Sequence, residues 1–162
     1  MEKIKQEIEE LTSDILLKND MFKVPVDIIQ LASNYNIDVY KQDLGKGISG
    51  AIRYDDKSQT FSILLNQTES QKRQRFTLAH ELGHYFLHRD ILISDVIHID
   101  TLYRMPAENE KEVDYFAGAL LMNKILVEKA YQEGITSIAE LSETFKVSES
   151  AMTVRLDILG LL

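Results

Sequence analysis

The chain has 162 residues, of which 44% are hydrophobic and 27% are charged, and its formal net charge is −8. This composition is typical of a globular domain and excludes a fibrous or disordered chain. Cysteine is absent, so disulfides are excluded and any metal site must be built from histidine and carboxylate side chains. The acidic excess also disfavours nonspecific binding to nucleic acid or to an anionic membrane.

The first segment mixes charges of both signs and carries Ile4, Ile8, Leu11 and Ile15 at helical spacing. This pattern predicts an amphipathic helix and not the apolar region of a signal peptide. No later stretch approaches the roughly 18 apolar residues that a membrane-spanning helix needs. We therefore expect a cytoplasmic protein that has no membrane partner.

A second helix is predicted to begin at Pro25, because a missing amide hydrogen costs nothing in the first turn of a helix. This helix is expected to carry Ile28, Ile29 and Leu31 inward and to end near residue 36. It would therefore pack against the rest of the domain through these apolar side chains.

Three runs rich in β-branched and aromatic side chains then predict strands at residues 37–40, 48–54 and 60–65. Residues 55–59 are polar and would form the hairpin turn between the last two strands. Thr68 and Gln71 have the spacing of a capping box, which predicts a helix from about residue 69 to about residue 88.

The second half of the chain is predicted to be mainly helical. Residues 89–107 are expected to be irregular and residues 108–122 to form a helix, followed by two or three short helices broken near Gly134 and Val147. The predicted fold class is α+β, with a small sheet of about three strands packed with several helices.

The sequence RFTLAHELGHYFLH, residues 75–88, places two histidines four residues apart on one face of the predicted helix. Imidazoles at this spacing can bind one metal ion, and Glu81 can reach a water molecule beside it as a general base. The alternative is that His80, Glu81 and His84 lie by chance on a solvated face. The apolar flanks favour the metal site because they would bury this helix. His88 lies about 12 Å along the axis from His80, too far to share the ion, and is expected to pack nearby.

A catalytic zinc site needs a third protein ligand, and the sequence offers two sources for it. Asp90 stands six residues after His84, but Leu87 occupies the position where such motifs have a glycine that turns the chain back. The other source is a glutamate near the start of the helix predicted over residues 108–122.

Glu108, Glu110 and Glu112 are the candidates in that helix. Glu110 lies close to the buried face, whereas Glu112 is expected more toward solvent, so we choose Glu110 as the ligand. The remaining two would be charges favoured near a helix N-terminus. Asp114, one turn after Glu110, would accept a hydrogen bond from the far nitrogen of a ligand histidine.

The segments RQRFTLAHELGHYFLH and EKEVDYFAGALLM resemble the ImmA/IrrE family of metallopeptidases. Members of this family typically show R-F-T-x-A-H-E-x-G-H and then E-x-x-A-N-x-F-A-x-x-L-L-M-P. The resemblance covers about residues 24–122 and implies zinc bound by His80, His84 and Glu110, with Glu81 as the catalytic base.

The sequence departs from the family pattern at Val113, Asp114 and Asn123, where the family usually has alanine, asparagine and proline. These departures leave the implied ligand set intact. We expect one metallopeptidase domain over residues 1–162, with a core of about 24–122 and a C-terminal helical subregion of about 123–162.

The expected activity is zinc-dependent endopeptidase chemistry, in which the metal activates water and Glu81 takes its proton. The residues considered for stabilising the oxyanion are His98, Tyr103, Arg104 and Tyr115. The substrate would lie extended along an edge of the sheet, and residues 91–110 would partly cover the cleft. The resemblance implies a helix-turn-helix repressor as the substrate, and the charge of −8 would attract a basic repressor while repelling DNA.

Residues 137–162 predict two helices joined by a short turn that begins near Lys146, which resembles a helix-turn-helix. A second hypothesis is therefore a DNA-binding regulator with a structural or sensory metal. A third is a non-catalytic interaction module that binds metal. Direct binding of nucleic acid is disfavoured, because Arg155 is the single arginine of this segment and its charge is net negative.

Overall fold

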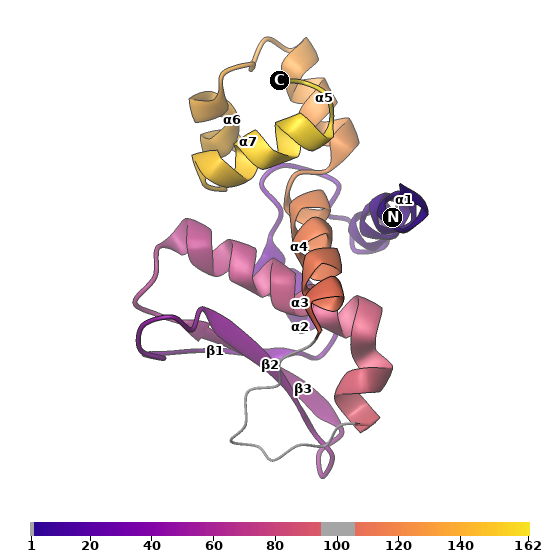
Figure 1. The fold of residues 1–162 in the computed structure, drawn as a ribbon, viewed down its shortest axis with the longest axis vertical. Coiled ribbons are helices and arrows are strands. Elements are labelled where there is room, and N and C mark those ends of the chain that lie inside the picture. Colours follow the sequence, from indigo (N-terminus) through magenta and orange to yellow (C-terminus); the bar gives the residue numbers. More distant parts are fainter. Residues whose placement is uncertain (1, 95–105) are drawn as a thin grey trace.

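The structure is a computed structural model that describes residues 2–94 and 106–162, and it has an α+β fold, as predicted (Figure 1). Strands β1 (Asp38–Gln42), β2 (Gly50–Asp55) and β3 (Thr60–Asn66) form one sheet in the order β1-β3-β2. β1 runs parallel to β3, and β2 pairs antiparallel with β3. This order leaves β2 at one edge of the sheet.

The central strand alternates between its two faces, so that Phe61, Ile63 and Leu65 are buried. Helix α3 (Gln71–Ser94) packs against β2 and β3. Gly50 permits the close approach of β2 to this helix, because a Cβ atom there would lie 2.6 Å from Thr77 Cγ2. Helix α3, which carries the sequence HELGH, is thereby held against the edge strand β2.

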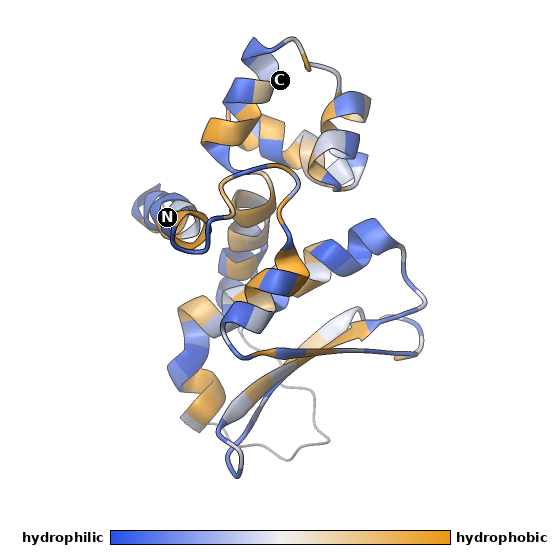
Figure 2. Ribbon diagram, turned by 180° about the vertical axis from the view of Figure 1, so that it is seen from behind, coloured by the Kyte–Doolittle hydropathy of each residue, from blue (hydrophilic) through white to orange (hydrophobic). Residues whose placement is uncertain are grey.

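Helix α1 (Glu2–Lys18) packs against helix α4 (Ala107–Leu121). Its amphipathic pattern was predicted, and Ile8 and Ile15 are buried in the core, whereas Ile4 is 39% exposed. Polar and apolar residues alternate around this helix and along the C-terminal helices (Figure 2). No helix within the described residues is long and apolar enough to cross a membrane.

Helix α2 (Ile28–Asn34) begins three residues later than predicted. Its N-cap is Asp27, whose side chain accepts a hydrogen bond from the Gln30 amide at 3.1 Å. Ile28 and Leu31 are buried, as predicted. Ile29 is 49% exposed, so the prediction that it points inward is wrong.

Helix α3 begins at Gln71 and not at residue 69. Ser70 caps it by accepting a hydrogen bond from the Arg73 amide at 3.2 Å, whereas the hydroxyl of Thr68, the predicted cap, donates to Asn66 at 2.7 Å. The helix continues to Ser94 across a kink at His88, so the irregular structure predicted from residue 89 is wrong for residues 89–94.

The C-terminal part contains α5 (Lys124–Gln132), α6 (Ile138–Phe145) and α7 (Glu149–Ile158). The breaks fall near Gly134 and Val147, as predicted, and Lys146 adopts a left-handed conformation between α6 and α7. Side-chain oxygens cap all three helices, and the capping residues are Asn123, Ser137 and Ser148.

A buried ion pair joins these helices to the N-terminal helix. Arg155 is 2% exposed, and its guanidinium donates to both carboxylate oxygens of Glu9 at 2.7 Å and to the carbonyl of Met122 at 2.8 Å. Tyr115 also donates to Glu9, at 2.6 Å. Arg155 therefore has a structural role. It is not the basic surface residue that a DNA-reading helix would need.

Burial alone would raise the pKa of Glu9, but the hydrogen bond and the charge of Arg155 outweigh it and lower that pKa. A carboxyl group with a lowered folded-state pKa stabilises the fold above its unfolded pKa. This contribution is lost as the pH falls through the lowered value.

The substitution Glu9→Gln is expected to lower the free energy of unfolding by roughly 2 to 3 kcal/mol at neutral pH, because Arg155 loses its anionic partner. Thermal unfolding should show a midpoint about 5 to 10 °C lower. Glu7→Gln, on the exposed face of the same helix, is the control. The difference from the parent should shrink below about pH 4.3, and equal destabilisation by both substitutions would refute the role of the ion pair.

Candidate metal centre

The candidate site lies where α3 and α4 pack against each other, and Gly83 sets their separation. A Cβ atom at Gly83 would lie 3.0 Å from Val113 Cβ and 3.1 Å from Phe116 Cδ1. Any side chain would therefore push the two helices apart. The glycine in HELGH serves helix packing and brings the first turns of α4 close to the histidines of α3.

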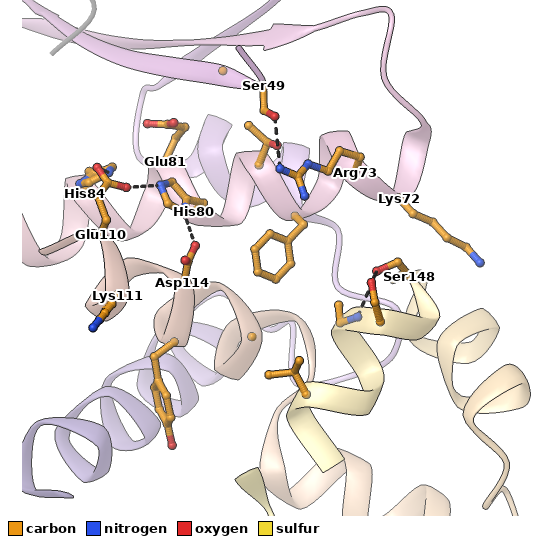
Figure 3. Close-up of a pocket in the computed structure, with 18 of the residues that line it drawn as sticks. Ser49, Lys72, Arg73, His80, Glu81, His84, Glu110, Lys111, Asp114 and Ser148 are labelled. Atoms are coloured by element: carbon orange, nitrogen blue, oxygen red, sulfur yellow. Dashed lines mark hydrogen bonds and ion pairs between the residues drawn. The ribbon is translucent and has the colours of Figure 1, made fainter. Parts of the chain in front are cut away.

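Three of the predicted residues meet at this crossing (Figure 3). His80 and His84 come from α3 and Glu110 comes from the first turn of α4. One nitrogen or oxygen from each of them lies within 4.8 Å of the others. The Glu110 oxygens are 2.9 Å from His80 Nε2 and 3.3 Å from His84 Nε2.

These separations suit the ligands of a single small cation. Zinc bonds of about 2.0 to 2.1 Å at a tetrahedral angle place two ligand atoms about 3.3 Å apart. The two nitrogen-to-oxygen distances, 2.9 and 3.3 Å, are near this value. Two imidazoles and one carboxylate are also the donors that such an ion accepts in a catalytic site. The three side chains therefore fit a zinc-like ion.

Asp114 holds the far side of the His80 ring. Its carboxylate lies 2.7 Å from His80 Nδ1 and can accept a hydrogen from it, which leaves Nε2, the nitrogen nearer to Glu110, as the atom that a metal ion could bind. Burial would lower the pKa of His80, but the hydrogen bond to Asp114 and the neighbouring carboxylates outweigh it and raise the pKa. The ring therefore sits in a strongly negative environment that favours a cation.

His84 is buried, and burial together with the charges of His80 and His88 lowers its pKa to about 3. The ring is accordingly neutral and can offer a lone pair. Its Nδ1 lies 3.4 Å from Nδ1 of His88, whose Nε2 lies 3.5 Å from Glu112. One of the two facing Nδ1 atoms carries the hydrogen between the rings.

The prediction that Glu112 lies toward solvent is wrong. Its side chain is 31% exposed, compared with 37% for Glu110, and it faces His88. The periodicity of α4 could not reveal this contact, because the partner of Glu112 is His88 on another helix. The backbone of α3 is also kinked at His88. The buried His88 does lie beside a candidate ligand, as its place on the same stripe indicated.

Glu81 is 8% exposed and extends from α3 on the side toward the sheet, whereas Glu110 and Asp114 rise from α4 on the other side (Figure 3). Burial raises the pKa of Glu81 to about 7, with Glu110 adding repulsion and His80 opposing both. A carboxylate whose pKa is near neutrality can both accept and return a proton at neutral pH.

The other residues that were considered are not part of the group formed by His80, His84 and Glu110. Asp90 is exposed beyond the kink at His88. Tyr115 is partly buried and lines the same hollow, but its hydroxyl donates to Glu9 of α1, and burial and this contact raise its pKa to about 12. His98, Tyr103 and Arg104 lie outside the described residues, as does most of the stretch expected to cover the cleft.

A further feature of the site is the loop before β2, which the sequence analysis did not single out. Asn66 is 2% exposed, and its amide donates to the carbonyls of Gly45 and Ile48 at 2.8 Å. The loop and the first residues of β2, Gly47 to Ile52, line the same hollow as His80 and Glu81. The sequence marks this anchor only by a polar asparagine at the end of the strand sequence FSILLN.

Comparison with known proteins first defines the class. The chain is 25% identical to Metallopeptidase ImmA of Bacillus subtilis (strain 168) over 136 residues, which cover 83% of this chain and 77% of that protein. It is 37% identical to the Radiation response metalloprotease IrrE of Deinococcus radiodurans over 93 residues, which cover 55% of this chain and 28% of that protein. The protein is thus of the metallopeptidase class.

Residues 32–157 match the peptidase M78 family, the IrrE N-terminal-like domain, and the chain belongs to this family. The predicted resemblance to ImmA/IrrE metallopeptidases is therefore confirmed.

Among solved structures, a Mycobacterium tuberculosis transcriptional regulator has a similar fold, with a TM-score of 0.62 and 18% identity. The match covers 97% of this chain and 47% of the regulator, so the chain spans about half of its length. At this identity the likeness concerns the fold alone.

The substitution Gly83→Ala tests whether the helix crossing sets the site. Alanine favours a helix by about 1 kcal/mol over glycine, yet here its methyl group would displace α4. We expect weaker metal binding by roughly tenfold or more and a lower midpoint of thermal unfolding. Gly118→Ala in α4 is the matched control for both measurements, because a Cβ atom there meets only Met122 Cε, at 3.9 Å. Equal metal affinities in the two variants, measured by chelator competition, would contradict this account.

Proposed function

We propose that the protein is a zinc-dependent endopeptidase in which His80, His84 and Glu110 hold the metal and Glu81 is the catalytic base. The observation that supports this most directly is the convergence of two imidazoles and a carboxylate, with a second, buried glutamate beside them. Zinc, when bound, would supply a Lewis acid that acidifies water and polarises a peptide carbonyl.

The side chains of the protein would carry out the proton transfers. Glu81 takes a proton from the attacking water and then returns it to the leaving amine, a double role that its raised pKa supports. Asp114 holds the His80 ring in one tautomer and orientation through Nδ1. His88 and Glu112 would orient His84 in a similar way from the other side.

The substrate would bind as an extended chain along the edge strand β2. This strand pairs with β3 on one side, and its residues 50–52 line the hollow together with His80 and Glu81. Pairing with such an edge binds a peptide through its main chain and demands no particular side chain. A scissile peptide bond would thus be carried past Glu81.

For the substrate we propose a helix-turn-helix transcriptional repressor that is cut at one or a few sites. The resemblance to ImmA/IrrE peptidases suggests this partner, and the net charge of −8 suits a repressor with a basic DNA-binding surface. The alternative of a DNA-binding regulator rests on the helical pair α6 and α7. The burial of Arg155 against Glu9 counts against it.

The first test concerns the ligand set. His80→Ala, His84→Ala and Glu110→Ala should each weaken zinc affinity by more than the roughly 10- to 100-fold that loss of an outer partner costs. Asp114→Ala should fall within that range, because its effect passes through the His80 ring. Asp90→Ala is the control and should bind zinc like the parent. Competition with a chromophoric chelator measures all of these, and undiminished zinc in both histidine variants would end the proposal.

The second test separates the base from the ligands and examines the substrate. Glu81→Gln should retain about one zinc per chain yet lower the rate of cleavage by roughly 10²- to 10⁴-fold, because an amide cannot accept the proton of water. The purified protein is incubated with zinc and a helix-turn-helix repressor from the same organism, and intact mass is followed. One or two discrete fragments that are absent with Glu81→Gln are the expected result.

Two outcomes would change the proposal. An uncut repressor together with digestion of many unrelated unfolded proteins would identify a general peptidase. Salt-dependent binding of the zinc-loaded protein to duplex DNA, with no cleavage of any protein, would favour the regulator alternative.

A further inference from the structure

The hollow that contains the candidate metal centre continues past it between α3, α4 and α7. Its volume is about 1200 Å³, more than the roughly 300 to 1,000 Å³ of a pocket for one small molecule. In Figure 3, α7 faces α3 across this space. Beyond the polar residues of the metal centre, the walls of the hollow become mainly apolar. Polar side chains of the same helices, Lys72, Arg73, Ser148, Ser150 and Arg155, also line the hollow. We call the apolar part of this wall the apolar groove, and its residues are Phe76, Gly118, Met122, Ala151, Val154 and Ile158.

Helix α7 has two apolar stripes, and only one of them is used for packing. Met152 and Leu156 are fully buried in the core. Ala151, Val154 and Ile158 lie on a second stripe at positions i, i+3 and i+7, facing the groove. Val154 is 60% exposed and Ile158 is 43% exposed. Structural packing alone does not account for this second stripe.

Gly118 shapes the floor of the groove and differs from Gly83 in its surroundings. A Cβ atom at Gly118 would meet only Met122 Cε within 4 Å, at 3.9 Å, so no neighbour demands a glycine. Glycine inside a helix costs about 1 kcal/mol relative to alanine. The missing side chain therefore leaves space in the groove at a cost to the helix.

The groove is close enough to the metal centre to be reached by the same peptide. Phe76 lies one turn before His80, a rise of about 6 Å along α3. An extended chain advances about 3.3 Å per residue, so this distance corresponds to about two residues. A peptide paired with the β2 edge would pass Glu81 and then present a side chain to the groove.

We propose that the apolar groove is a specificity subsite that binds a large apolar side chain of the substrate polypeptide, about two to four residues from the cleaved bond. This inference rests on the proposed peptidase function. The occupant is the substrate chain, because the groove is one continuous hollow with the metal centre and the β2 edge. Helix α7, the second helix of the pair that resembles a helix-turn-helix, thus forms a wall for a protein substrate.

Binding to an array of twelve-residue peptides tests the subsite without relying on turnover. The probe protein is the zinc-loaded Glu81→Gln variant, and each peptide is present with leucine, phenylalanine, aspartate or lysine at successive positions. Peptides with leucine or phenylalanine at one position should retain the protein best. Adding Gly118→Leu, which fills the groove, or Val154→Asp, which places a charge in it, should reduce this retention by roughly tenfold or more.

Ile125→Asp is the matched control, because Ile125 is 57% exposed on α5 and does not line the groove. It should leave retention unchanged. Thermal unfolding checks each variant, and Val154→Asp decides the matter if Gly118→Leu fails to fold. Retention that is insensitive to Val154→Asp, or that shows no preference for apolar residues, would overturn the subsite.

Failure of the peptidase proposal would give a different result. The parent protein would then leave every retained peptide uncut, while the dependence of retention on Val154 persisted. Conversely, a parent that cuts peptides and a Val154→Asp variant with the same cleavage sites and rates would preserve the peptidase and remove the subsite.

Discussion

The closeness of α3 and α4 at Gly83 is the constraint on which the candidate site depends. A helix can place His80 and His84 on one face by its own geometry, but a third ligand must come from another element. Gly83 allows Val113 and Phe116 to approach the backbone of α3, and this approach brings the first turn of α4 to the two rings. The packing of α3 against α4 therefore fixes the position of Glu110 relative to the two histidines.

Burial gives the titratable groups of the site different electrostatic surroundings. His84 is neutral because it is enclosed and next to other imidazoles, whereas His80 is held by Asp114 and faces carboxylates. Glu81, which belongs to the same helix, lies on the sheet side and has a pKa near neutrality. Neighbouring groups on a single helix thus acquire separate roles because they face different partners.

The C-terminal helices illustrate how one sequence pattern can serve another purpose. Two short capped helices with a tight turn resemble a DNA-binding motif, yet the arginine of the second helix is buried against Glu9 of α1. This ion pair and the core stripe of α7 fix that helix opposite α3. The outward stripe, which includes Val154, then faces the space beside the metal centre. We infer that this arrangement contributes to recognition of a polypeptide.

The sequence by itself determined what depends on local geometry. The four-residue spacing of His80 and His84, the adjacent Glu81 and the alternating strands follow from the periods of helices and strands, and the family follows from the motifs. It also determined the α+β class and the breaks near Gly134 and Val147.

Tertiary structure decided what depends on contacts between distant segments. Glu110 and Glu112 could be ranked only partly by periodicity, since their partners lie on another helix, and the contact of Glu112 with His88 follows from the α3–α4 packing. The central position of β3, the exposure of Ile29 and the burial of Arg155 likewise have no local signal. Each of them is fixed by which surfaces meet, and the residues that decide this are far apart in the chain.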